Sequence, residues 1–186
     1  MKNIYLIGGG GHCKSCIDVI EQENKYHIKG IFDLPENIGK NILGYDVIGT
    51  DSDIKSYIKR ENFFLVTMGQ IGNPGQRLSY LKLNLATIIS PRAYVSKHST
   101  IGLGTIIMHD VIINANVNIG KNCIINSKAL IEHDAIIGDN CHISTTAVIN
   151  GSVVVGNDTF VGSGTITKNN ITIPKKSFIK ANSTVK

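Results

Sequence analysis

The chain has 186 residues, of which 42% are hydrophobic, so it can form one or two small domains with a packed core. Its formal net charge is +5, but no basic run with interleaved aromatic residues indicates nucleic-acid binding. No apolar run approaches the ~20 residues that a membrane span requires, and residues 1–8 lead from one charge into a strand and glycines rather than into a secretory signal. We therefore expect a cytoplasmic protein.

The N-terminal residues have the pattern of a βαβ unit. Residues 3–7 (NIYLI) indicate a buried strand, four glycines and His12 follow at once, and residues 15–23 carry an apolar helical face. A second strand at 28–32 ends before Asp33. A glycine turn ahead of a helix lets phosphates approach the backbone N–H groups, and an acid at this strand end can hold nucleotide hydroxyl or N–H groups. The glycines satisfy the dinucleotide fingerprint only in part, so we expect a mononucleotide-sized site, with an empty tight turn as the alternative.

Further elements extend this unit to about residue 85. We expect an edge strand at 45–49, a helix at 51–59 capped by Asp51 or Ser52, a buried strand at 63–68 that ends before Gly69, and a helix at about 74–83. The strand ends at Gly8, Asp33 and Gly69 would then face one crevice. The sequence therefore predicts a Rossmann-like α/β domain over residues 1–85.

From residue 89 onwards, one aliphatic residue recurs at every sixth position, and only Thr167 breaks the series. Its members are Ile89, Val95, Ile101, Ile107, Ile113, Ile119, Ile125, Ile131, Ile137, Ile143, Ile149, Val155, Val161, Ile173, Ile179 and Val185. The residue two positions earlier is small or β-branched over most of the stretch, as at Cys123 and Ala135. Neither a helix nor an ordinary strand has a period of six, so the pattern indicates a coil of higher order.

Glycine sets the size of this coil. It follows the aliphatic residue at positions 102, 120, 138 and 156, a spacing of eighteen. Three hexapeptides per turn predict a triangular parallel β-helix over residues 86–186, in which each coil contacts mainly its neighbours. We expect the four glycines at corners that need a positive φ.

The cysteines and the C-terminal lysines each allow two interpretations. Cys123 and Cys141 fall on the small-residue register, so we expect them in the core. Cys13 and Cys16 form a CxxC, which can be redox-active at the start of a helix, although two inert helix thiols are the simpler interpretation. No metal-ligand spacing is present. After Asp158 the chain carries five lysines and no acid, which indicates either a solvated rim or attraction of a phosphate-bearing ligand.

Several motifs resemble a known family. The hexapeptides that begin at Ile119 (IGKNCI) and Val155 (VGNDTF) resemble the repeat of the hexapeptide-repeat acyltransferases, whose β-helix is left-handed. With the glycine turn, Asp33, Gly69 and the segment Ile131-Glu-His-Asp, the chain resembles the bacterial sugar acyltransferases that join a nucleotide-sugar-binding βαβ domain to such a helix. It is most similar to the N-acetyltransferases that act on a UDP-linked 4-amino-4,6-dideoxy sugar, as in the bacillosamine and legionaminic acid routes to surface glycans. The sialic acid O-acetyltransferases are close relatives.

This resemblance implies an acetyl transfer from acetyl-CoA to the 4-amino group, with His133 as general base. Neutral imidazole accepts a proton near pH 7, and an adjacent carboxylate orients the ring, a role that we assign to Asp134, with Glu132 as the alternative. The resemblance also places acetyl-CoA at His142, Gly151, Gly162, Ser163 and Ala181, and the nucleotide sugar at Gly10, Gly11, His12, Asp33 and Gly69. His98 and His109 have no motif support, and we expect both to be solvated.

The resembled group is trimeric, with CoA between neighbouring helices, so a homotrimer is implied. Family members often continue into a Val-Gly-x-Pro-Ala tail over the CoA, whereas this sequence ends at Lys186, so we expect a longer natural chain or a partner to cover the last coil. Two other functions stay open. One is O-acetylation of sialic or another nonulosonic acid, and the other is a non-catalytic nucleotide-binding scaffold, which the Glu-His-Asp segment disfavours.

Overall fold

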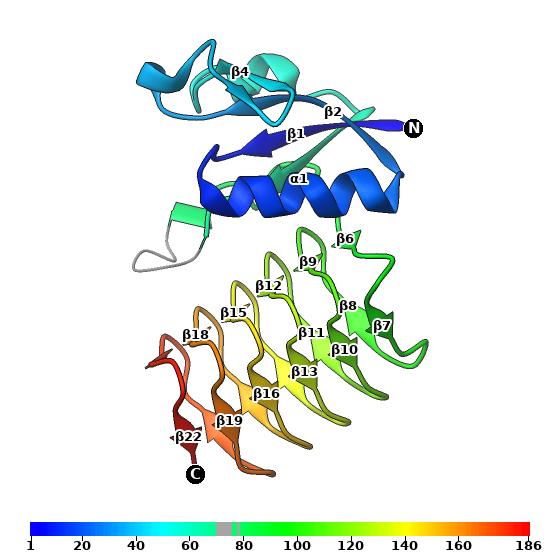
Figure 1. Ribbon diagram of the computed structural model, residues 1–186, viewed down its shortest axis with the longest axis vertical. Helices are drawn as coiled ribbons and strands as arrows, with labels where there is room; N and C mark the ends of the chain where they lie inside the picture. Colours follow the sequence, from blue (N-terminus) through cyan, green and yellow to red (C-terminus); the bar gives the residue numbers. More distant parts are fainter. Residues whose placement is uncertain (70–75, 78) are drawn as a thin grey trace.

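The computed structural model describes the whole chain except residues 70–75 and 78, and it consists of a small α/β layer above a long β-helix (Figure 1). Residues 74, 75 and 78 of the helix that we expected at about 74–83 lie outside the described residues, but residues 79–82 form turns, so the helix does not extend to residue 83. Among the residues that are described, no helix is long and apolar enough to cross a membrane.

The α/β layer is a five-stranded sheet in the order β3-β4-β2-β1-β5. Its strands are β1 (Lys2–Ile7), β2 (Tyr26–Phe32), β3 (Asn41–Ile42), β4 (Tyr45–Gly49) and β5 (Asn62–Val66). All neighbours pair in parallel except β3 and β4. The helix α1 (Gly11–Glu23) buries one apolar face and ends at Asn24, whose φ of 56° gives the left-handed C-cap. The predicted βαβ unit is therefore present, with α1 starting earlier than expected.

Two predictions in this layer were wrong in detail. The strand at 45–49 is not an edge, because β3 pairs along its outer side. The expected helix at 51–59 is one 3-10 turn, η2 (Ile54–Tyr57), and a second such turn, η1 (Pro35–Asn37), follows β2. Near η2, the Asp53 carboxylate accepts hydrogen bonds from the backbone N–H and hydroxyl of Thr50. Such local side-chain bonds compete with a regular helix.

The β-helix consists of two-residue strands stacked in three parallel sheets. The first sheet holds β6 (Ile88–Ile89), β9 (Ile106–Ile107), β12 (Ile124–Ile125), β15 (His142–Ile143), β18 (Phe160–Val161) and β21 (Phe178–Ile179). The second holds β7 (Tyr94–Val95), β10 (Ile112–Ile113), β13 (Leu130–Ile131), β16 (Val148–Ile149), β19 (Ile166–Thr167) and β22 (Thr184–Val185). The third holds β8 (Thr100–Ile101), β11 (Asn118–Ile119), β14 (Ile136–Ile137), β17 (Val154–Val155) and β20 (Thr172–Ile173). We call them the β6, β7 and β8 sheets.

Stacking follows the predicted spacing of eighteen residues. Ile113, for example, pairs with Val95 and with Ile131. The aliphatic and small registers both point inward, and side chains such as Cys123, Ala135 and Cys141 are fully buried. This confirms the expected triangular coil and the place of these two cysteines in its core.

The prediction for the coil glycines was wrong. Gly102, Gly120, Gly138 and Gly156 do not have a positive φ; that conformation falls mainly on Asn, Asp and other residues such as Asn116, Asp134 and Thr146. The reason for glycine is the distance between coils. A Cβ on Gly102 would lie 2.5 Å from the carbonyl carbon and oxygen of Gly120 in the next coil.

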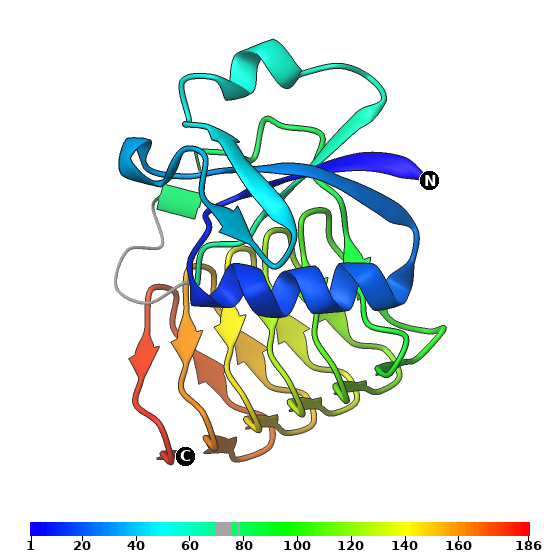
Figure 2. The same ribbon diagram turned by 45° about the horizontal axis from the view of Figure 1, so that its top comes forward.

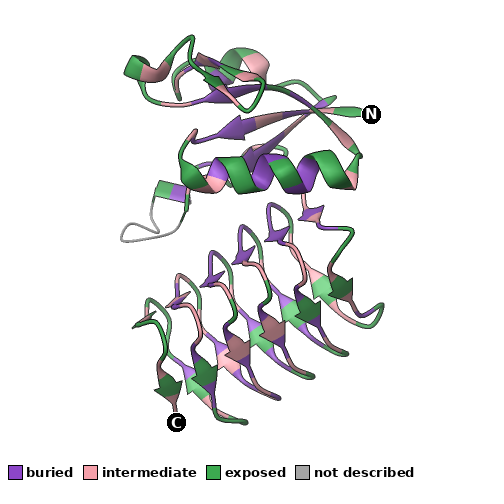
Figure 3. Cartoon of the chain, viewed as in Figure 1, coloured by how far each residue is buried: buried purple, intermediate pink, exposed green. Residues whose placement is uncertain are grey.

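The α/β layer sits on the β6 sheet through α1, which packs against β6 and runs along several successive coils of the β-helix (Figure 2). The outward residues Ile88, Ile106 and Ile124 of this sheet are fully buried. Figure 3 shows these buried strands on the side of α1, whereas the β7 sheet keeps exposed positions.

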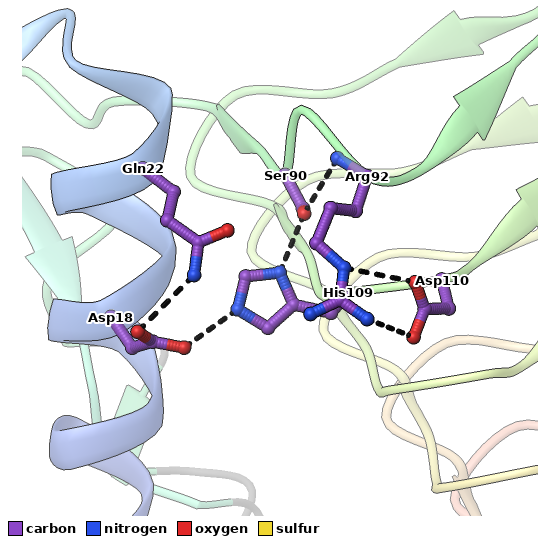
Figure 4. A network of polar contacts seen from close by, with 6 residues as sticks. All are labelled: Asp18, Gln22, Ser90, Arg92, His109 and Asp110. Atoms are coloured by element: carbon purple, nitrogen blue, oxygen red, sulfur yellow. Dashed lines mark hydrogen bonds and ion pairs between the residues drawn. The ribbon is translucent and has the colours of Figure 1, made fainter.

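A polar network joins α1 to the first coils (Figure 4). His109 Nε2 lies 2.7 Å from an Asp18 carboxylate oxygen, and its Nδ1 lies 2.7 Å from Ser90 Oγ. The side chain of His109 is only 15% exposed, so our expectation of a solvated His109 was wrong. His98 is exposed, as expected.

Candidate active site

His133 lies at the corner between β13 and β14, and its side chain is 59% exposed. Its Nδ1 is 2.7 Å from Asp134 Oδ2, so this carboxylate reaches the ring. Asp134 is held in turn by Asn116, whose amide donates to Oδ1 at 2.7 Å. This hydrogen bond, and then the one with His133, hold the pKa of Asp134 below its usual range. The carboxylate therefore stays charged at neutral pH and favours the tautomer in which Nδ1 carries the proton and Nε2 can accept one.

Glu132 does not share this role. Its carboxylate accepts a hydrogen bond from Asn114 at 2.9 Å, in the preceding coil. The structure therefore pairs His133 with Asp134, whereas Glu132 joins two successive coils.

Gly151 lies one coil after His133, directly against its ring. A Cβ on Gly151 would lie 2.8 Å from Cε1 and 2.9 Å from Nε2 of His133. Any side chain here would press on the Cε1–Nε2 edge of the ring. Glycine at this position therefore leaves Nε2 of His133 accessible.

Three of the other residues expected at the cofactor lie at a different corner, between the β6 and β7 sheets; they are Gly162, Ser163 and Ala181. Ser163 Oγ is 2.9 Å from Ser144 Oγ, and a Cβ on Gly162 would lie 2.5 Å from the backbone nitrogen of Ala181. His133 and Gly151 occupy the corner between the β7 and β8 sheets. One chain therefore separates the two halves of the expected acetyl-CoA site by the width of the β7 sheet.

His142 lies on the outward face of the β6 sheet and is only 5% exposed. Its Nε2 is 3.2 Å from the Asn126 amide nitrogen, and the edge of its ring packs on Phe160, which stacks on Phe178. Its ring centre is 6.4 Å from that of His12, at the start of α1. The structure therefore brings one residue expected at the cofactor close to one expected at the nucleotide sugar.

The strand ends of the α/β sheet surround a cavity of about 180 Å³, which Gly8, Asp33 and Met68 line together with Asp51 and Tyr80. Gly8 has a φ of 100°, and Asp33 accepts a hydrogen bond from Asn37 at 2.8 Å. Gly69 follows Met68, and a Cβ on it would lie 3.7 Å from the Cβ of His12.

Gly10 and Gly11 are exposed, and no described atom lies within 4 Å of a Cβ built on either of them. The N-terminal N–H groups of α1 are therefore open to a ligand. A second cavity, of about 410 Å³, shares Asp33 with the first, and Gly9, Lys14 and Lys40 also line it. Sequence reasoning missed these two lysines, although a lysine in the first turn after a glycine loop was a visible signal.

Burial determines the charge states of the histidine and the two cysteines in the N-terminal half of α1. Burial, and then the charge of Arg77, lower the pKa of His12 to about 4, and within the described residues its Nε2 has no hydrogen-bond partner. Burial raises the pKa of the Cys13 thiol to about 11 and also raises that of Cys16. These thiols stay protonated, which argues against the redox interpretation of the CxxC. The described residues contain no group of His, Cys, Asp or Glu placed to hold a metal ion.

Two protein families divide the chain between them. Residues 3–82 match the PglD N-terminal domain family, and residues 83–185 match the GMPPB C-terminal domain family. An uncharacterized protein, L142, of Acanthamoeba polyphaga mimivirus is 38% identical over 101 residues, which are 53% of this chain and 20% of that protein. The chain thus spans a fifth of the length of this relative.

Solved structures match the fold over the full chain. PerB from Caulobacter crescentus, solved in complex with CoA and GDP-perosamine, is 28% identical with a TM-score of 0.89, and the match covers 100% of this chain and 89% of that one. The acetyltransferase domain of PglB from Neisseria gonorrhoeae is 23% identical with a TM-score of 0.88, over 100% and 92% of the two chains. The chain therefore belongs to the hexapeptide-repeat sugar acyltransferases, with a PglD N-terminal domain ahead of a left-handed β-helix of the GMPPB C-terminal domain family.

Proposed function

We propose that the protein transfers an acetyl group from acetyl-CoA to the 4-amino group of a UDP-linked 4-amino-4,6-dideoxy sugar in the cytoplasm. The observation that carries the proposal is the contact between His133 and Asp134, next to the space that Gly151 leaves free. Perosamine N-acetyltransferase, at 27% identity, is a relative with this type of chemistry.

In the proposed reaction the amine nitrogen attacks the thioester carbonyl carbon, and His133 Nε2 takes a proton from that nitrogen. Asp134 stabilises the resulting imidazolium through the Nδ1 hydrogen bond. The tetrahedral intermediate then collapses, the C–S bond breaks, and CoA leaves as its thiol with the proton. His142 is proposed to hold the thioester carbonyl, where a donor would stabilise the developing oxyanion.

We propose the nucleotide site at the cavity between Gly8 and Asp33, with the diphosphate at the N–H groups of Gly10, Gly11 and His12. The open N-terminus of α1 suits an anion, and Lys14 and Lys40 add positive charge on the same side. Asp33 and Gly69 would contact the nucleoside. That residues 1–85 and 86–186 form two separate domains stays a prediction.

A homotrimer would complete the acetyl-CoA site. The corner with Gly162, Ser163 and Ala181 of one copy would face the corner with His133 and Gly151 of the next. An apolar stripe along the β7 sheet lies between these corners and would supply the contact; its members are Tyr94, Ile112, Leu130, Val148 and Ile166. The exposed lysines at the C-terminal end would lie near the CoA phosphates.

The test is thiol release from acetyl-CoA with a panel of UDP- and GDP-linked 4-amino-4,6-dideoxy sugars, beside free and CMP-linked sialic acids. We expect turnover on a UDP-amino sugar and a loss of about 10²- to 10⁴-fold in kcat for His133→Ala. His98→Ala, an exposed histidine, is the matched control. Turnover on sialic acids alone would replace the proposal with O-acetylation, and turnover on GDP-linked sugars alone would correct the nucleotide.

A further inference from the structure

Arg77 is a buried cation between the two parts of the molecule. Its side chain is only 1% exposed. Nη1 donates hydrogen bonds to the carbonyls of Val66, at 3.1 Å, and Met68, at 2.5 Å, where β5 ends. Nη2 donates to the carbonyl and side-chain oxygens of Asn122 in the β-helix, at 3.1 and 3.0 Å. One guanidinium therefore joins the end of β5 to the coil that contains Asn122.

The partners of Arg77 are neutral oxygens, and no carboxylate among the described residues forms an ion pair with it. A buried charge is tolerated only when hydrogen bonds replace its hydration. A guanidinium has five donors in a fixed planar arrangement, so it also fixes the directions of its acceptors. An apolar side chain of similar size would fill this space but would not fix the directions of these carbonyl and amide oxygens.

The contact continues along the β-helix as a chain of amides. The Asn122 amide donates to Asn140 at 3.1 Å, and the Asn140 amide donates to the Asp158 carboxylate at 2.8 Å. The guanidinium of Arg77 can only donate and the carboxylate of Asp158 can only accept, so the two ends decide which way both amides point; the Asn122 amide nitrogen also donates to the backbone carbonyl of Arg77, at 3.4 Å. Hydrogen bonds therefore connect Asn122, which binds Arg77, to the next two coils.

The other side of this contact reaches the proposed nucleotide site. Thr67 lies between the two carbonyls that Arg77 holds, and its hydroxyl lies 3.0 Å from the carbonyl oxygen of Ile7 and 2.6 Å from that of Gly8. Met68 lines the cavity with Gly8 and Asp33. Arg77 therefore holds, through Thr67 and Met68, the turn on which the nucleotide would rest.

We propose that Arg77 is a positioning residue for the nucleotide sugar: it fixes the glycine turn and the end of β5 in one geometry and locks both to the coil of Asn122. The sugar is then presented at a set height along the β-helix. This inference rests on the proposed function, because it concerns the same nucleotide site.

The experiment compares Arg77→Met, Arg77→Lys and Asn122→Gly with the native protein. Glycine at 122 keeps the left-handed backbone, whose φ is 55°, and removes only the amide. Arg92→Met is the matched control, because Arg92 is exposed and pairs with Asp110 away from β5. The measurements are the Kd for UDP and for GDP by calorimetry, kcat, and KM for each substrate, at a temperature where circular dichroism shows each variant folded.

For Arg77→Met we expect the Kd of the bound nucleotide to rise roughly tenfold or more and kcat to fall, with KM for acetyl-CoA unchanged. Arg77→Lys should recover part of the affinity. Asn122→Gly should lower kcat severalfold at an unchanged nucleotide Kd, because the bonds to β5 remain. Arg92→Met should change none of these values.

A folded Arg77→Met variant with native nucleotide Kd and kcat would overturn the inference. If that variant does not fold, Asn122→Gly decides, and a native kcat there would overturn it. A fall in the affinities for nucleotide and acetyl-CoA together would show a general loss of structure and would also overturn it. Failure of the proposed function is seen separately, as a native protein that binds neither UDP nor GDP or transfers no acetyl group.

Discussion

The pair of His133 and Asp134 depends on a backbone conformation as well as on a charge. Asp134 has a φ of 61°, in the left-handed region that Asp and Asn tolerate better than most residues. This conformation and the hydrogen bond from Asn116 aim the carboxylate at Nδ1 of the preceding residue. Its pKa is depressed, so the interaction is present above the ordinary pKa of Asp and is lost only as pH falls through the lower, folded value.

We predict that Asp134→Asn lowers kcat by about 10- to 100-fold. The amide can still contact the ring, but it cannot stabilise an imidazolium as a carboxylate does. Glu132→Gln is the control, and it should keep near-native kcat because Glu132 bonds to Asn114 instead. Steady-state kinetics decide between them, and an equal loss in both variants would contradict the assignment to Asp134.

His12 leads to a prediction about pH and stability. Its pKa of about 4 in the folded protein is below its ordinary 6.5, so between these values the unfolded chain binds more protons and stability falls as pH falls. The effect reaches about 3 kcal/mol near pH 4, at 1.36 kcal/mol for each pKa unit. Urea unfolding from pH 7 to pH 4 should show a weaker pH dependence for His12→Asn than for the native protein. His98→Asn should keep the native dependence, because His98 is exposed, and a native pH dependence in His12→Asn would contradict the prediction.

At the scale of elements, the space available to a side chain at a corner of one coil is limited by the backbone of the next coil. Ladder hydrogen bonds of 2.8 to 3.0 Å, as at Gly102 and Gly120, fix the separation between coils. A methyl group on Gly102 would enter the backbone of the next coil, whatever its own φ. Steric contact between coils therefore explains the glycine spacing of eighteen.

We predict that Gly102→Ala destabilises the protein by about 1–3 kcal/mol, the usual cost of overpacking. Leu103→Ala is the matched control, because Leu103 is the next residue and 62% exposed, and its effect should stay within about 0.5 kcal/mol. Urea unfolding measures both. Equal stability of the Gly102→Ala variant and the native protein would show that the coils can separate.

The six-residue period was enough to predict the three sheets and their register, because every inward side chain repeats the same environment. It did not predict the corners, where several residue types adopt a positive φ and glycine serves another purpose. The turn at Asp53 was missed because a local hydrogen bond outweighs helix propensity there. His109 and Arg77 were beyond sequence reasoning, since their partners lie as far as 91 residues away and meet only when α1 docks on the coils.

At the scale of the whole molecule, the apolar stripe on the β7 sheet separates the two corners that share the proposed acetyl-CoA site. Ile112 and Ile166 in this stripe are 43% and 49% exposed. A row of exposed apolar side chains on a protein surface is typical of a contact with another chain. Assembly and catalysis should therefore be lost together.

We predict that Ile112→Asp converts a trimer into monomers and removes most acetyl transfer, while UDP binding stays native because the α/β layer is untouched. Ile58→Asp, at a residue outside the stripe that is 54% exposed, should change neither property. Sedimentation velocity gives the mass, and thiol release gives the activity. An active Ile112→Asp monomer would contradict the proposal that neighbouring copies share the site.

Because α1 and Arg77 fix the α/β layer to particular coils, the distance from this layer to any residue further along the β-helix is set by the number of coils between them. Each coil adds about 4.8 Å along the axis and re-forms the same ladder with the coil before it. Duplication of one eighteen-residue coil between Asn122 and His133 would keep the fold intact and move the imidazole one step away from the sugar. With the sugar and the base placed as proposed, the number of coils between these two residues would set the distance from the nucleotide to the reacting amine, in steps of one coil.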